Sequence, residues 1–244
     1  WKKNSNLLNG GLFMKQKFEK NETLFCILLI IAYVLVNSYC MQNYGYASLI
    51  SFIINTLLSF VLIWIMIVLK RIEYYGLRKI NNIKEYLYFV PLFLIASVNL
   101  WNGFNLNKST SEIIFHILTM INVGFIEEII FRGFLFKMMV KDNVKSAIIV
   151  SSLTFGIGHI VNLLNGADLI PTLIQICCAV SLGYLFVTIF YKSKSLIPCI
   201  VTHIVINATS IFNIENTISL YIAPIVLIIV PLIYSCYINK KVKE

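Results

Sequence analysis

Apolar residues dominate the chain in runs long enough to cross a membrane, and short polar segments separate these runs. Windows of about 17 to 25 apolar residues are typical of membrane-spanning helices, and this chain supplies about eight of them. The windows lie near residues 23–41, 47–69, 86–101, 111–136, 146–164, 169–190, 196–213 and 218–237. The pattern predicts an all-α fold, a polytopic transmembrane helical bundle of about eight spans.

One short motif marks the start of a predicted helix, and a second marks the end of another. Ser109 is followed three residues later by Glu112, the spacing of a capping box at the start of the fourth predicted helix. Asn165 and Gly166 form a dipeptide typical of turns, directly after the fifth.

Basic residues alternate with the predicted spans in a way that orients the chain. All but two of the 20 lysines and arginines fall on one side of the predicted membrane; Lys108 lies on the other side and Arg132 within a span. The positive-inside rule then predicts that both termini are cytoplasmic. The net charge of +9 does not indicate a nucleic-acid partner, because the basic residues are distributed between apolar segments and do not form one patch.

The composition predicts one membrane domain and no separate soluble one. Hydrophobic residues make up 59% of the chain, and the mean hydropathy is +0.83. We expect a single integral-membrane domain at 23–237, a cytoplasmic N-terminal segment at 1–22 that is in part a tag or an extension, and a cytoplasmic basic tail at 238–244. The abundance of Ile, Asn and Lys indicates an AT-rich bacterial source, so the predicted location is the bacterial cell membrane.

Three ionisable residues stand within six consecutive positions of the apolar fourth span. Ionisable groups at membrane depth are costly, so such a cluster is a functional-site hypothesis. Glu128 and Arg132 are at i and i+4 and can neutralise each other. Glu127 is turned about 100° from Glu128 around the helix axis and has no local cation, which suits a general base.

Polar residues in two later spans lie at compatible depths. On a rise of 1.5 Å per residue, Glu127 lies about 15 Å from the cytoplasmic end, His159 about 21 Å and His203 about 14 Å. His203 and Asn207 share a helix face and offer adjacent donors for an oxyanion. The sequence therefore predicts one site built from three helices, in a cavity reached from the cytoplasmic side.

Structural roles compete with this interpretation. A lone histidine in a membrane often serves only to hydrogen-bond one helix to another. The Glu128–Arg132 pair could be structural alone. His116 lies near the outer end of the fourth span, apart from His159 and His203, and we interpret it as structural.

The sequence has EExxxR at 127–132, FxxxH at 155–159 and HxxxN at 203–207, in that order on successive apolar segments. This arrangement resembles the motifs of the CPBP family, the CAAX proteases and bacteriocin-processing enzymes. The resemblance implies an intramembrane glutamate-type endopeptidase that needs no cofactor. It also implies that Glu127 and His159 activate a water molecule, that His203 and Asn207 stabilise the oxyanion, and that Glu128 and Arg132 support the site.

The expected partners are the lipid bilayer and a membrane-associated peptide or protein substrate, in peptide or bacteriocin maturation or in self-immunity. Three alternatives stay open. Two histidines and two glutamates could hold zinc in a metalloprotease, although HExxH is absent. The chain could instead be a non-proteolytic immunity or binding protein. A transporter is the third alternative, but no inverted repeat is evident.

Overall fold

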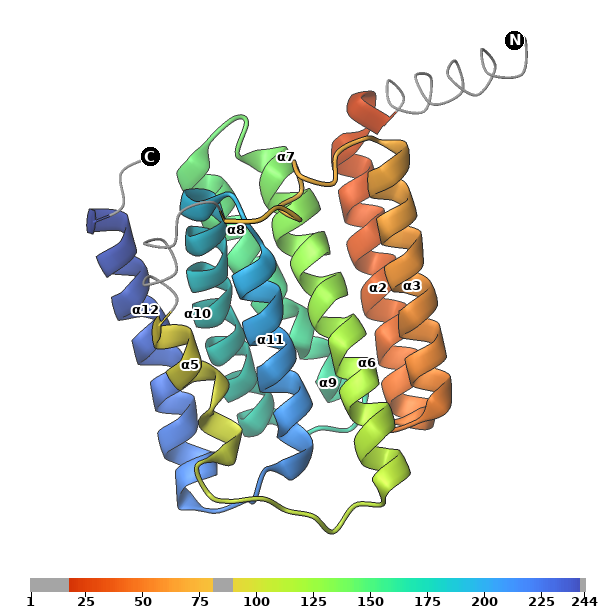
Figure 1. The fold of residues 1–244 in the computed structure, drawn as a ribbon, viewed down its shortest axis with the longest axis vertical. Helices are drawn as coiled ribbons and strands as arrows, with labels where there is room; N and C mark the ends of the chain where they lie inside the picture. The colour runs from red at the N-terminus through yellow and green to blue at the C-terminus, as the bar shows by residue number, and fades with distance from the viewer. Residues whose placement is uncertain (1–17, 81–89, 242–244) are drawn as a thin grey trace.

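The computed structural model describes residues 18–80 and 90–241, which form a bundle of roughly antiparallel helices (Figure 1). No strand occurs within these two ranges. The predicted all-α class is therefore confirmed. Residues 1–17 of the predicted N-terminal segment and 242–244 of the predicted tail lie outside the described residues, and the division into 1–22, 23–237 and 238–244 stays a prediction.

The helices follow one another with short connections. Their bounds are α2 (Glu22–Tyr44), α3 (Leu49–Val68), α5 (Val90–Ala96), η2 (Val98–Leu100), α6 (Thr110–Glu128), η3 (Ile129–Phe136), α7 (Lys137–Met139), α8 (Val144–Ile157), η4 (Gly158–Ile160), α9 (Val161–Leu164), α10 (Leu169–Ser193), α11 (Ile197–Thr209), η5 (Ser210–Phe212), η6 (Ile218–Ile222) and α12 (Ala223–Lys241).

Within the described ranges, six helices are long and apolar enough to cross a membrane. They are Glu22–Tyr44, Leu49–Val68, Thr110–Met139, Val144–Leu164, Leu169–Ser193 and Ile218–Lys241. Their number and composition are those of a multi-pass membrane protein.

One of the eight predicted spans is shorter in the structure than expected, and another is described only in part. The apolar helix at Ile197–Phe212 is below the length of a full crossing. In place of the span predicted at 86–101, the structure has the seven-residue helix α5 and the turn η2, while 86–89 lie outside the described residues. Pro91 and the polar Ser97 and Asn99 interrupt this segment. The count of eight stays a prediction.

Basic side chains gather at one end of the bundle, hereafter the basic end. Helices α3, α10 and α12 finish at this end, and the chain turns there through α7 into α8 (Figure 1). The basic residues carried there are Lys70, Arg71, Arg78, Lys79, Lys137, Lys141, Lys145, Lys192, Lys194, Lys240 and Lys241. The opposite end consists of the connections around residues 45–48, 101–109, 165–168 and 213–217.

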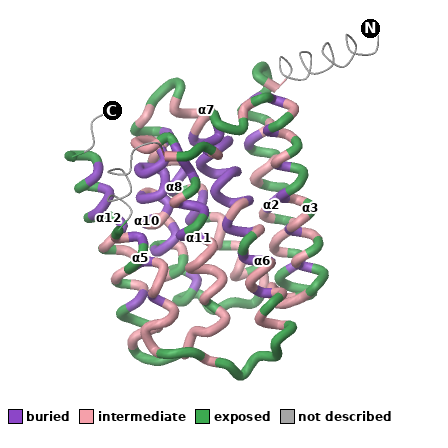
Figure 2. The backbone as a smooth tube through the Cα atoms, in the orientation of Figure 1, coloured by how far each residue is buried: buried purple, intermediate pink, exposed green. Residues whose placement is uncertain are grey.

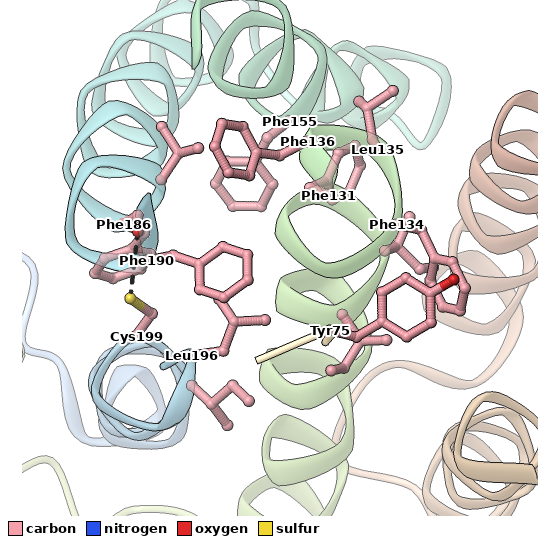
Figure 3. Packing of buried hydrophobic residues seen from close by; sticks show 14 of the residues in the cluster. Tyr75, Phe131, Phe134, Leu135, Phe136, Phe155, Phe186, Phe190, Leu196 and Cys199 are labelled. Carbon is pink, nitrogen blue, oxygen red and sulfur yellow. Dashed lines mark hydrogen bonds between the residues drawn. The ribbon is translucent and has the colours of Figure 1, made fainter. Parts of the chain in front are cut away.

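The most tightly packed part of the core lies in the half of the bundle next to the basic end (Figure 2). Phe134, Phe136, Phe186 and Phe190 are each at most 1% exposed. Figure 3 shows Phe186 and Phe190 near Leu196 and Cys199, and Phe134 beside Tyr75 on the other side of the helix. The Cys199 thiol donates to the carbonyl of Phe186 at 3.4 Å. This aromatic cluster fixes α6, α10 and α11 relative to one another.

Both local motifs predicted from the sequence are present. The Ser109 hydroxyl accepts from the Glu112 amide at 3.3 Å, and the Glu112 carboxylate accepts from the Ser109 amide at 2.9 Å, which completes the capping box. Gly166 turns the chain between α9 and α10 with a φ of +87°, a conformation that favours glycine.

Candidate functional site

Glu128 and Arg132 form a buried ion pair, as their spacing predicts. Arg132 Nη1 donates to Glu128 Oε1 at 3.1 Å, and both side chains are fully buried. The guanidinium carbon lies 4.2 Å from the ring centroid of Phe155 and 5.7 Å from that of Phe186. The positive charge of Arg132 therefore also makes cation–π contacts with two aromatic rings. This pair ties the EExxxR motif on α6 and η3 to α8 and α10.

The helix changes pitch directly after the two glutamates. Residues Ile129–Phe136 form a π-helix that continues α6 without a break. Such wide turns are rare and occur frequently at functional sites.

His203 joins both glutamates, an arrangement that the sequence did not predict. Its Nδ1 lies 2.8 Å from Glu128 Oε1, and its Nε2 lies 3.3 Å from Glu127 Oε2. Glu128 is paired with Arg132 and accepts, so Nδ1 is the donor in the first contact. In the second contact, Nε2 and Oε2 lie within ion-pair distance of each other. His203 is thereby oriented by Glu128, with Nε2 turned toward Glu127.

Tyr33 supplies a further contact to Glu127 from outside the three motifs. Its hydroxyl donates to Glu127 Oε1 at 2.7 Å, and the two residues are 94 positions apart in the chain. Tyr33 is 5% exposed and Glu127 is 8% exposed. Sequence reasoning missed this residue because no local spacing connects α2 with α6.

His159 and Asn207 complete the predicted set. Both are half-buried and line the same cavity as Glu127 and His203. The His159 ring packs edge-on against Phe155 with 5.6 Å between the ring centroids, but no hydrogen bond joins His159 to Glu127 in the structure. All four residues predicted to be catalytic are thus brought to one cavity.

His116, interpreted from the sequence as structural, contacts the end of α11 near the start of α6. Its Nε2 lies 3.1 Å from the backbone oxygen of Asn207 and 3.2 Å from the hydroxyl of Ser210, and it lines the cavity. The helix α11 reaches down beside the start of α6, which brings Asn207 to the level of His116. His116 therefore holds the turn of α11 that carries Asn207.

The cavity has a volume of about 630 Å³, within the usual range for binding sites. Its walls are largely apolar, with Val34, Met120 and Leu182 among them. Neutral polar groups also line it: Asn37, Ser38, Tyr46, Asn162, Asn165 and Gln175. Burial, and to a lesser extent the charge of Glu127, raise the pKa of Tyr46 to about 12, so its hydroxyl stays protonated at neutral pH.

Small residues let the helices that carry the site approach closely. A Cβ added at Gly156 would lie 2.9 Å from the backbone nitrogen of Val180. A Cβ at Gly183 would lie 3.1 Å from Arg132 Nη2 and 3.2 Å from the Cα of Ser152. Glycine at these positions places α8 against α10 next to the ion pair.

Among the residues that the structure describes, no group of three His, Cys, Asp or Glu side chains is arranged to hold a metal ion. Glu127, Glu128 and His203 do meet, but Glu128 and His203 direct their contacting atoms at each other and at Arg132. The donor set is engaged in an ion-pair network and does not present an open ligand shell.

Comparison with known proteins identifies the segment that carries the motifs. Residues 109–209 match the family model described as Type II CAAX prenyl endopeptidase Rce1-like, and this segment includes all three motifs. No curated protein and no solved structure matches the chain. The matched family is a protease family. The part of the chain that forms the site is therefore similar to the CAAX proteases, as the motifs indicated.

Proposed function

We propose that the protein is an intramembrane endopeptidase that hydrolyses a peptide bond of a membrane-associated peptide or protein through a water molecule activated by Glu127 and His159. The observation that carries the proposal is the single cavity lined by Glu127, His159, His203 and Asn207. A base, a second water-orienting group and two oxyanion donors on one surface are the parts that peptide hydrolysis needs.

The contacts of Glu127 suit a general base. Tyr33 occupies Oε1, so Oε2 is the oxygen that faces His203 and is left to take a proton. In the proposed step Glu127 acts as a carboxylate. It then removes a proton from water while the water oxygen bonds to the carbonyl carbon of the substrate, and His159 holds the same water.

The negative oxygen formed in this step needs donors. His203 Nε2–H and the side-chain amide of Asn207 supply them, and Glu128 stabilises the positive charge of the His203 ring. The intermediate then collapses: the C–N bond breaks, the leaving nitrogen takes the proton back from Glu127, and a carboxylic acid and an amine are the products.

The proposal needs no metal. Glu128 already contacts both Arg132 and His203, and a zinc ion would have to displace these contacts. Hydrogen bonds from His203 and Asn207 take the place of Lewis-acid stabilisation. A zinc-dependent protease is the alternative that a chelator tests.

We also propose that about eight segments enter the membrane and that both described ends of the bundle, at Glu22 and Lys241, face the cytoplasm. The basic end supports this orientation, because positive charge accumulates in cytoplasmic connections. The predicted bacterial origin agrees with a role in peptide or bacteriocin maturation or in self-immunity.

The test is cleavage of a library of peptides and membrane peptides by the purified protein in lipid. The native chain is compared with Glu127→Gln, with Glu73→Gln as the control because Glu73 is exposed at the basic end. We expect cutting by the native chain and by Glu73→Gln that survives a chelator and disappears in Glu127→Gln. If no form cuts any peptide while both native and Glu127→Gln chains protect cells from a bacteriocin, the protein is a binding or immunity protein and not a protease.

A further inference from the structure

The cavity occupies only the half of the bundle that lies away from the basic end. Helix α6 lines it with His116, Met120, Val123 and Glu127, and η3 adds Phe131, so that each turn contributes one residue. Helix α6 runs toward the basic end (Figure 1). Beyond Phe131, no residue of η3 or α7 takes part. The catalytic residues therefore stand at the inner limit of the cavity.

The neighbouring helices repeat this pattern. Helix α2 contributes only its second half, from Tyr33 to Met41, and α2 runs away from the basic end. Helix α10 contributes Gln175 to Phe186 and nothing from its last turns at the basic end. The lining residues of these helices thus lie between the level of Glu127 and the end of the bundle opposite the basic end.

A packed connection closes the basic end. Residues 69–80 cross this end between α3 and the start of α11 (Figure 1). Tyr75 is fully buried there, Gly76 accepts from the Leu196 amide at 2.9 Å, and a Cβ at Gly76 would lie 2.5 Å from the Phe190 ring. The described residues of this layer are therefore closely packed against α10 and the start of α11.

Ion pairs add to the closure. Glu22 at the start of α2 is paired with Lys141 and lies 3.9 Å from Arg71, which is also paired with Glu19. These contacts join α2, the connection after α3 and the connection after α7 across the basic end.

The cavity opens where α9 turns into α10. Gly166 and Ala167 line it and are exposed. The Ser38 hydroxyl donates to Asn165 Oδ1 at 2.9 Å, and Asn162 donates to Gln175 Oε1 at 2.8 Å, so neutral amides frame this mouth. Among the described lining residues, Glu127 carries the only carboxylate and no lysine or arginine is present.

The charges at the two ends differ in sign. The described residues near the mouth end include Glu112, Asp168 and Glu215, against the single Lys108. The basic end carries the lysines and arginines named above. By the positive-inside rule the mouth faces away from the cytoplasm, and not toward it as the depth of the motifs had led us to expect.

From the one-sided cavity, the closed basic end and the neutral mouth, we infer that the substrate reaches the site from the extracytoplasmic face. The substrate class is an exported or membrane-anchored peptide whose scissile segment is uncharged and apolar and lies at the outer surface of the membrane. The inference rests on the proposed function for the cleavage itself, but the side from which the cavity opens does not depend on it.

Thiol labelling tests the open side without any proteolysis. The six native cysteines are replaced first, because Cys178 lines the cavity, and single cysteines are then placed at Ala167 or Leu169 beside the mouth and at Lys145 at the basic end. Intact cells are treated with a membrane-impermeant maleimide. We expect Ala167→Cys and Leu169→Cys to react in intact cells and Lys145→Cys to react only after permeabilisation. The reverse pattern, or reaction at the mouth only after permeabilisation, overturns the inference.

A second arm uses the native chain in vesicles sorted by orientation. The probe is an impermeant quenched peptide with an uncharged, apolar core, chosen from those cut in detergent. We expect cleavage when the mouth faces the added peptide and at least a tenfold lower rate when the basic end faces it; the opposite preference overturns the inference. If labelling succeeds but no peptide is cut in any orientation or in detergent, the proposed function fails while the direction of opening stands.

Discussion

The hydroxyl of Tyr33 donates a hydrogen bond to Oε1 of Glu127 at 2.7 Å, across 94 residues of sequence. Tyr33 belongs to α2, which lies outside the segment that matches the protease family. The proposed base is therefore positioned by a helix that the family motifs do not include. This contact leaves one carboxylate oxygen, Oε2, to exchange a proton with His203 or with water.

Replacing Tyr33 by Phe removes this hydrogen bond and little else. A hydrogen bond to a charged group contributes about 1.5 to 3 kcal/mol, so we expect kcat to fall by about 10- to 100-fold with KM nearly unchanged. Tyr221→Phe is the control, because Tyr221 is 63% exposed on another helix. A kcat equal to that of the native chain, measured on a substrate found in the library, would show that Tyr33 does not position the base.

Arg132 cannot be replaced by lysine without loss. Lysine keeps the charge but lacks the planar group that lies 4.2 Å from the Phe155 centroid while bonding to Glu128. Removing one partner of a buried pair costs about 3 to 5 kcal/mol, so Arg132→Ala is expected to lower the melting temperature strongly and Arg132→Lys to lie between it and the native chain. Thermal unfolding in detergent measures this order. Equal stability of all three proteins would contradict it.

The contact between Glu128 and His203 predicts that their substitutions are not additive. Each single change, Glu128→Ala or His203→Ala, removes the 2.8 Å contact, so the double variant loses less stability than the sum of the two single variants. Residues in one network show coupling of about 0.5 to 3 kcal/mol. A double-mutant cycle on the free energy of unfolding measures this coupling, and a value of zero would mean that the contact contributes nothing to the fold.

Two glycines that precede His159 form a matched pair. A Cβ at Gly156 would lie 2.9 Å from the Val180 nitrogen and 3.0 Å from the Ile176 oxygen, whereas a Cβ at Gly158 would meet no atom within 4 Å. Overpacking costs about 1 to 3 kcal/mol, so Gly156→Ala should lower the melting temperature. Gly158→Ala should leave it close to the native value. Equal melting temperatures for the two variants would show that α8 and α10 do not approach as closely as the structure has them.

Much of the architecture follows from hydropathy and local spacing. The apolar windows predicted the long helices, and the i,i+4 spacing predicted the ion pair of Glu128 with Arg132. The lengths of some predicted spans could not be predicted, because hydropathy does not show how far a segment continues as a helix. The window at 86–101 is apolar on average; the structure describes it only from Val90, and there α5 ends at Ala96, before the polar Ser97 and Asn99.

The sequence predicted which motif residues would form the candidate site, but not the contacts between their side chains. The three motifs named the residues that line the cavity, but Tyr33 and His116 entered it only through the packing of distant helices. Depth along a single helix also did not reveal which end of the bundle is closed. That closure comes from Tyr75, Gly76 and Leu196, which lie in connections that hydropathy leaves unassigned.

The central claim, that Glu127 is the general base, is tested most directly by comparing substrate affinity with the single-turnover rate in Glu127→Gln. The amide keeps the size of the side chain and can still contact Tyr33, but it cannot take a proton from water. We expect the substrate Kd to stay within about threefold of the native value and the single-turnover rate to fall by about 10²- to 10⁴-fold, the usual contribution of general-base catalysis. A single-turnover rate close to native, with binding intact, would contradict the claim and remove Glu127 from the chemical step.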